Sequence, residues 1–203
     1  MDKKLSLTQL DLLKEIGTIG AGRAATALAE LIAARVEISV PQTSLVSLEQ
    51  IPDILGGAEQ LFFVLDIGFE GDIKGRMFLL FLPKEARRLS SILIGKTPEE
   101  IDFNDDLFKS ALKESANILC GSFISALAEL TGMRIGSSVP SLAMDMVGAI
   151  LDFIFIQIAE TAEEALYIKT DLKIKGLQFD GFFLFFPYAE SLFSIFNALG
   201  LKQ

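Results

Sequence analysis

Ser110, Glu114 and Asn117 have the types and the spacing that could do chemistry from one side of a helix. At about 100° per residue the three side chains fall within about 60° of one another, opposite the leucines of the same stretch. The chain has no histidine and one cysteine, Cys120, which excludes Ser-His and Cys-His dyads and disfavours a zinc site. Any catalysis must therefore use carboxylates, amides, hydroxyls or lysine, and we expect no metal ligands.

A similar row of polar residues occurs a second time, earlier in the chain. Residues 11–41 and 110–140 share 14 identities in 31 positions without a gap, which indicates an internal duplication. The earlier row and its downstream proline are Asp11, Glu15, Thr18 and Pro41. In the later copy the proline is Pro140, at the same distance from the row.

Two plainer interpretations stay open at this point. A solvated helix face is also made of Glu, Lys, Ser and Asn, although Asn costs a helix about 0.5 kcal/mol relative to Ala and the row recurs with its proline. The glycines of "GTIGAG" (17–22) could suggest a phosphate-binding loop, but they lie inside a helical period and the second copy keeps only the last of them. We expect these small residues to allow a close approach between helices, or between a helix and the sheet.

The elements that must position the rows also repeat. Periodicity predicts long helices over about 7–33 and 106–131 and closing helices over 84–94 and 188–199; strands are expected around 35–48, 133–144, 61–82 and 151–186. We therefore predict an α/β (α+β) fold: a pseudo-twofold duplicated domain with a largely antiparallel sheet and two long surface helices. Residues 1–203 are expected to form one domain, with half-repeats at about 7–95 and 106–200 and a polar linker at about 96–105.

Charge and composition narrow the class of protein. The net charge is −9 and the pI about 4.6, which disfavours nucleic acid and membrane surfaces as partners. One cysteine allows no internal disulfide, and the start of the chain does not read as a secretory signal. The longest apolar stretch, residues 147–159, is too short to cross a bilayer. We expect a cytoplasmic protein.

The spaced residues resemble a known signature. Ser110-x3-Glu114-x2-Asn117, followed after 22 residues by Pro140, is similar to the motif of the CheC/CheX/FliY phosphatases of chemotaxis. The resemblance covers essentially the whole chain, and two full halves within about 200 residues favour the CheC branch. It implies a phosphatase that removes the phosphoryl group from the aspartyl phosphate of the response regulator CheY.

The resemblance also implies roles for the residues. The receiver domain of CheY supplies Mg²⁺, a lysine and a hydroxyl residue, and the phosphatase needs no cofactor of its own. An amide can accept from and donate to a water, so Asn117 is expected to orient the attacking water, and Glu114 to pair with the receiver lysine. Ser110 is expected to help the interface, and Pro140 to shape the loop beside the site.

The earlier copy departs from the motif at Thr18, where the amide is missing. A β-branched hydroxyl is shorter and cannot hold the same two-point geometry, so we expect a degenerate first site that is weak or inactive. The family also binds the deamidase CheD, and "SLAMDMVGAILDF" resembles the segment that docks it, with Asp145 as the polar anchor. Alternatively, Met144, Met146 and Val147 simply belong to the core.

Two other functions remain open on the sequence. A non-catalytic adaptor would sequester phosphorylated CheY or regulate CheD with little turnover, and a single intact site fits that class. A structural component of the flagellar switch would co-purify with switch proteins and would not bind CheD.

Overall fold

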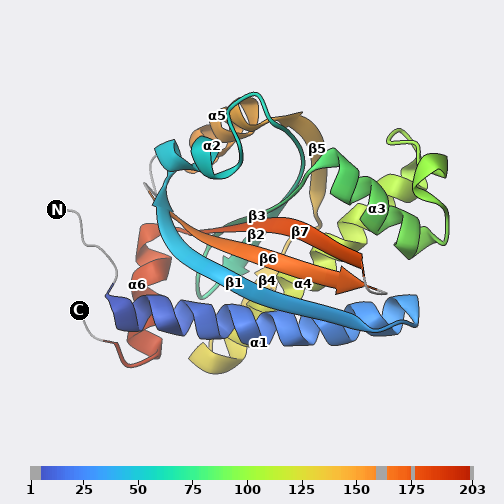
Figure 1. Ribbon diagram of the computed structural model, residues 1–203. Helices are drawn as coiled ribbons and strands as arrows, with labels where there is room; N and C mark the ends of the chain where they lie inside the picture. Colours follow the sequence, from blue (N-terminus) through green and yellow to red (C-terminus); the bar gives the residue numbers. More distant parts are fainter. Residues whose placement is uncertain (1–5, 159–163, 175–176, 202–203) are drawn as a thin grey trace.

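A computed structural model describes residues 6–158, 164–174 and 177–201 of the chain (Figure 1). The helices are α1 (Leu7–Ile32), α2 (Ile51–Ile54), α3 (Pro83–Ile94), α4 (Asp106–Thr131), α5 (Val147–Ile158) and α6 (Ala189–Ala198). The strands are β1 (Val36–Ser47), β2 (Leu61–Gly71), β3 (Gly75–Phe81), β4 (Ile135–Ser137), β5 (Ser141–Met146), β6 (Glu164–Ile174) and β7 (Leu177–Pro187).

The strands form one antiparallel sheet whose order mirrors the duplication. The order is β1-β6-β7-β3-β2-β4, and β5 also pairs with β2. Exchanging β1 with β4 and β5, β2 with β6, and β3 with β7 reproduces the same order in reverse. α1 and α4 each contain 26 residues and begin 99 positions apart. This confirms the predicted α/β fold with a largely antiparallel sheet and two long helices. The single-domain reading and the limits of the half-repeats stay predictions.

Helices cover both faces of the sheet and give it two cores. In Figure 1 α1 and α4 lie below the sheet, and α2 and α5 lie above it. Because side chains alternate along a strand, Phe63 and Leu65 of β2 join the core between the sheet and α1 and α4, while Phe62 and Val64 join the core between the sheet and α2 and α5. The lower layer therefore presents the outer faces of α1 and α4 to solvent.

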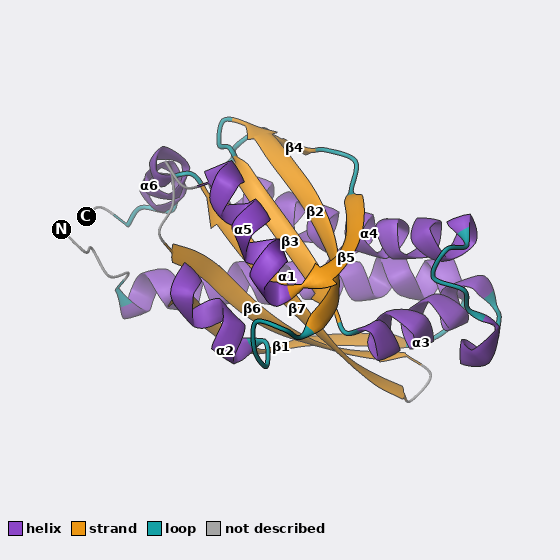
Figure 2. Ribbon diagram, turned by 90° about the horizontal axis from the view of Figure 1, so that it is seen from above, coloured by secondary structure: helices purple, strands orange, loops and turns teal. Residues whose placement is uncertain are grey.

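α1 and α4 pack against each other at a glycine. A Cβ added at Gly20 would lie 2.9 Å from Cα of Phe123, closer than real side chains allow. The glycines of "GTIGAG" all lie inside α1 rather than in a loop, so the close-approach interpretation is confirmed at Gly20 and the phosphate-loop interpretation is wrong. Figure 2 shows the two helices extending side by side beneath the sheet.

One predicted strand segment is wrong. Residues 151–158 belong to α5, whereas the apolar, phenylalanine-rich sequence suggested a strand. Val147, Ile150, Leu151 and Ile154 are all buried, and this spacing is that of one helix face. Residues 159–163 of the expected strand lie outside the described residues. In the part of the chain that the structure describes, no helix combines the length and apolar content needed to cross a bilayer.

Candidate functional site

The three polar residues of the later row lie on the outer face of α4. Ser110, Glu114 and Asn117 are all exposed. On the opposite face Leu112 and Cys120 are completely buried against the sheet. The helical period therefore places the row where the sequence predicted it, on the exposed side of α4.

The start of α4 is fixed by a side-chain cap. Asp105 precedes the helix and accepts a hydrogen bond at 2.9 Å from the backbone N–H of Leu107. This hydrogen bond, together with the nearby Lys96 ammonium, holds the pKa of Asp105 below its ordinary value. Because the polar row begins only one turn later, the cap also fixes where the row sits.

The inner side of α4 next to Asn117 is closely packed. Ser115 and Ala116 are fully buried, and the Ser115 hydroxyl donates to the carbonyl oxygen of Ala111 at 2.9 Å. Burial raises the pKa of the Cys120 thiol far above its usual range, which favours the neutral thiol over the thiolate. The side of α4 opposite Asn117 is therefore packed into the core.

The proline that completes the motif sits at a break in the sheet edge. Pro140 is buried between β4 and β5. The preceding Ser138 is tied to β2 twice: its N–H donates to the carbonyl oxygen of Gly68 at 2.8 Å, and its hydroxyl accepts from the Gly68 N–H at 2.9 Å. The short loop before Pro140 is thereby fixed to the sheet, while Val139 projects outward and is 85% exposed.

The earlier row has the same placement but a different third side chain. Asp11, Glu15 and Thr18 are exposed on α1. The Thr18 hydroxyl donates to the carbonyl oxygen of Lys14 at 2.9 Å, one turn back on its own helix. Pro41 falls in β1 at the register shift between Ser39 and Gln42, which matches the break before Pro140. The exposed row and its downstream proline are thus repeated, but the hydroxyl donor of Thr18 is already hydrogen-bonded within its own helix.

The two rows belong to neighbouring helices that are joined at the surface. Arg23 of α1 forms a salt bridge with Glu129 of α4. Both side chains are largely exposed, so the pair contributes at most about 1 kcal/mol to stability. This salt bridge joins α1 and α4 at a point that lies after Thr18 and Asn117 in their respective helices.

Asp145 lies on a different part of the surface. It is exposed on β5, the strand at the sheet edge next to β2, and its carboxylate accepts from the N–H of Met146 at 2.8 Å. Met144 and Met146 are about half exposed and only Val147 is buried, so the alternative that both methionines belong to the core is wrong. The exposed Phe153 and Ile156 on α5, which sequence reasoning missed, add apolar surface to the same layer.

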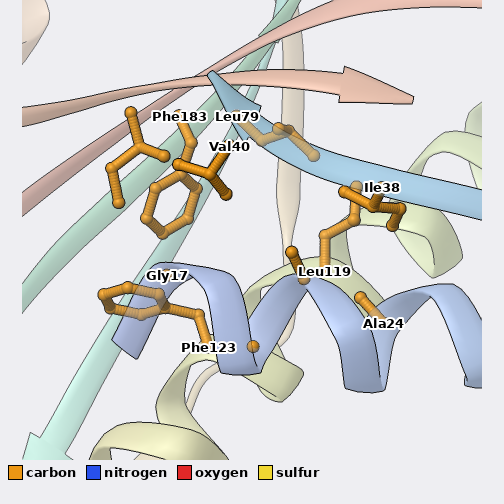
Figure 3. A pocket seen from close by; sticks show the side chains of 11 residues that line it. Gly17, Ala24, Ile38, Val40, Leu79, Leu119, Phe123 and Phe183 are labelled. Carbon is orange, nitrogen blue, oxygen red and sulfur yellow. The ribbon is translucent and has the colours of Figure 1, made fainter. Parts of the chain in front are cut away.

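A pocket near the rows has no chemistry of its own. It lies between α1, α4 and the sheet, and Figure 3 shows Gly17, Val40 and Phe123 around it. Its volume is about 40 Å³ and every residue that lines it is apolar. Among the residues that the structure describes, no group of three or more His, Cys, Asp or Glu side chains could hold a metal ion. The polar rows lie outside this pocket, on exposed surface of α1 and α4.

Sequence reasoning missed the anchor of the proline loop. Ser138 and Gly68 are 70 positions apart, and only the sheet register brings them together. A signal was nevertheless present, because Ser138 repeats Ser39 of the earlier copy.

Models of two related families match the two copies separately. The model described as chemotaxis phosphatase CheX matches residues 63–152, and that of the CheC-like family matches residues 9–45. The first range contains the whole row that ends at Asn117 together with Pro140. The second contains the row that ends at Thr18 together with Pro41.

Individual proteins show the same relationship. The chain is 33% identical over 196 residues to the CheY-P phosphatase CheC of Bacillus subtilis, which covers 95% of this chain and 94% of that one. The crystal structure of Thermotoga maritima FliY superposes with a TM-score of 0.79 at 21% identity, over 98% and 99% of the two chains. The structure of a CheX–CheY–BeF₃–Mg²⁺ complex from Borrelia burgdorferi matches with a TM-score of 0.50 at 14% identity, over 86% and 96%.

Proposed function

This chain belongs to the CheC family of CheY-P phosphatases, and on that premise we propose that it hydrolyses the aspartyl phosphate of CheY at one intact site on α4. The observation that carries the proposal is the complete row Ser110, Glu114 and Asn117 on the outer face of α4. The row lies in the open, where a folded receiver domain can dock against it.

The chemistry needs a water placed in line with the phosphorus. The water oxygen forms the new P–O bond while the bond between phosphorus and the aspartyl oxygen breaks, which restores the CheY carboxylate and releases inorganic phosphate with the protons of the water. The side-chain amide of Asn117 holds that water with two hydrogen bonds: its oxygen accepts one from the water, and its NH₂ donates one to the water oxygen. An amide is no base, so its contribution is position and orientation.

Glu114 acts on the partner rather than on the water. It lies one turn before Asn117 on the same face of α4, where it pairs with the lysine of the receiver site and fixes how the receiver docks. Ser110, another turn back, extends the contact. Pro140 ends the anchored loop beside the site and limits where the receiver can rest.

CheY carries the Mg²⁺ that the reaction uses. A CheX–CheY complex has been crystallised with beryllofluoride and Mg²⁺, and beryllofluoride stands in for the phosphoryl group of the active receiver. Bound to CheY, Mg²⁺ neutralises charge on the phosphoryl oxygens. The residues of this chain supply only the positioned water and the docking contacts.

The row on α1 is a degenerate site with little or no turnover. Asp11, Glu15 and Pro41 stand at the docking positions, so a receiver can bind there through Glu15. Thr18 cannot take the role of Asn117, because its hydroxyl donor is engaged by Lys14 and its side chain is shorter. CheD is a second partner, which docks on β5 around Asp145 beside the exposed methionines.

The decisive experiment compares the wild type with Asn117→Ala. Loss of the positioned water lowers the rate of CheY-P dephosphorylation on the order of 10²-fold, which corresponds to about 2.7 kcal/mol of barrier. Thr18→Ala is the matched control on α1 and leaves the rate within about twofold. Equal rates for Asn117→Ala and the wild type would refute the mechanism.

The alternative is a non-catalytic adaptor that sequesters CheY-P or regulates CheD. The missing amide at Thr18 favours it, since half of the molecule can then only bind. A catalyst present at about one-hundredth of the CheY concentration still clears all of the phosphate, whereas a sequestering protein protects at most its own equivalent. Complete clearance at that ratio excludes the adaptor.

A further inference from the structure

Gly121 is a glycine that the fold itself does not require. It lies in the interior of α4, in ordinary helical conformation, and is partly exposed. Among the described residues, a Cβ added there would meet no heavy atom within 4 Å beyond the adjoining backbone of its own helix. Glycine is the poorest helix former after proline, so its presence weakens the helix without relieving any internal contact.

Other helix glycines of the protein show what a reason within the fold looks like. Gly20 is needed because the backbone of Phe123 lies against it. Gly95 and Gly132 end helices with φ of +70°, a conformation that favours glycine. Gly121 has neither a crowded neighbour nor a positive φ.

The duplication preserves this unexplained glycine. Gly22 occupies the same place in α1, and an added Cβ would again meet nothing within 4 Å. Fewer than half of the aligned positions are identical between the two copies, yet this one is kept. Contacts within the fold therefore do not explain why both copies have glycine here, which points to a contact with a partner.

The position of Gly121 indicates what approaches it. It follows Asn117 by four residues, so both lie on the same face one turn apart. Asparagine has one methylene between its Cα and its amide, and the amide stays close to the helix surface. The short side chain therefore requires the partner surface to come close to this face of α4.

We propose that Gly121 is a docking residue, at which the receiver backbone of phosphorylated CheY rests directly on α4 so that Asn117 reaches the phosphoryl group. This rests on the function proposed above. A methyl group at this position separates the two surfaces and leaves the amide short of the reaction. Gly121 is thus a positioning residue, which sets affinity for the activated receiver and touches no reacting atom.

The test is Gly121→Ala, with Gly17→Ala as the matched control. Gly17 lies on the buried side of α1, and its added Cβ would make ordinary contacts with Ile168 and Val40, so both substitutions improve a helix but only one changes an outer face. We expect Gly121→Ala to keep or raise Tm and to increase both KM for CheY-P and Kd for CheY carrying beryllofluoride and Mg²⁺ at least tenfold. Gly17→Ala should leave both constants within twofold.

A Gly121→Leu variant should raise KM and Kd more than Gly121→Ala does, since a larger side chain separates the two surfaces further. The inference is overturned if Gly121→Ala binds and turns over CheY-P like the wild type, or if its Tm falls, because the glycine would then serve the fold. Asn117→Ala in the same assay separates the two proposals. If Asn117→Ala is inactive and Gly121→Ala is normal, only the docking inference fails; if Asn117→Ala is fully active, the proposed function fails.

Discussion

At the scale of single residues, the two copies of the motif differ in what the third side chain can bind. Asn117 presents an amide to solvent, and Thr18 turns its hydroxyl back to the carbonyl oxygen of Lys14. This back-bond is common for threonine inside helices and satisfies the only donor of the side chain. The second copy therefore keeps a free two-point hydrogen-bonding group that the first copy lacks.

Thr18→Asn should restore the missing amide. Because Glu15 and the structural surroundings of the row are already present on α1, we expect CheY-P phosphatase activity to rise, up to about twofold if both sites then turn over equally. The measurement is the initial rate of dephosphorylation at saturating CheY-P. The double variant Thr18→Asn, Asn117→Ala is the control, since it reports the α1 site alone; a clear fall in the rate of Thr18→Asn would contradict the proposed role of the amide.

At the scale of elements, the contact between α1 and α4 places both rows on one layer. Gly20 lets the helices approach, and Gly17 faces the small apolar pocket above them. The two glycines differ in the space around them: a Cβ at Gly20 would collide with the backbone of Phe123, whereas a Cβ at Gly17 would fit. Their substitution therefore separates packing from helix propensity.

Gly17→Ala should stabilise the protein and Gly20→Ala should destabilise it. Alanine at position 17 fills part of the pocket and improves the helix, a gain of about 0.5–1 kcal/mol. Alanine at position 20 pushes on the backbone of Phe123 and costs about 1–3 kcal/mol. Urea denaturation curves give both values, and the same sign for the two variants would disprove the close helix contact.

The cap of α4 should make stability depend on pH in the acid range. The lowered pKa of Asp105 means that its carboxylate stabilises the folded state at neutral pH. This contribution is complete above the ordinary value of 3.8 and disappears as the pH falls through the lowered pKa of the folded state. Asp105→Ala should therefore lower Tm at pH 7, and the difference from the wild type should shrink below pH 3.8.

Asp105→Asn is the control for that experiment. It keeps an oxygen that can accept from Leu107 but has no charge to titrate, so its Tm difference from the wild type should vary with pH while its cap remains. A Tm difference for Asp105→Ala that is constant from pH 7 to pH 3 would show that the charge contributes nothing.

At the scale of the whole molecule, the halves of the duplication are interleaved. β1 pairs with β6, β3 with β7, and β2 with both β4 and β5, so strands of different halves are neighbours throughout the sheet. Among the strands that the structure describes, only the pairs β2–β3 and β6–β7 join strands of one half. Neither half can complete its own sheet.

Separate halves should therefore fail to fold alone. We expect fragments 1–100 and 101–203 to lack native circular dichroism individually, because each leaves unpaired edges and an exposed apolar face. Mixed or co-expressed, the fragments should associate and recover phosphatase activity. An independently folded fragment with a cooperative thermal transition would contradict the single-domain organisation.

Periodicity was sufficient to predict α1, α4 and the exposure of their polar rows, because those facts depend on spacing within one helix. Residue composition was misleading for α5, where residues typical of strands follow the spacing of a helix and form one. The repeat of Ser39 marked Ser138, but its partner Gly68 could not be predicted, since the pair depends on sheet register between distant segments. The roles of Glu114 and Asn117 come from the family resemblance, and the outer-face glycine at 121 became visible only when its surroundings were known to be empty.

The mirrored strand order also bears on how the two rows could diverge. A sheet with this order is what two identical half-chains would form as a symmetric pair of subunits. In such a pair one gene encodes both sites, so any mutation that replaces the asparagine removes it from both at once. Joining the halves through residues 96–105 gives each site its own codon. Covalent fusion is therefore what allows one helix to lose the amide while the other retains it.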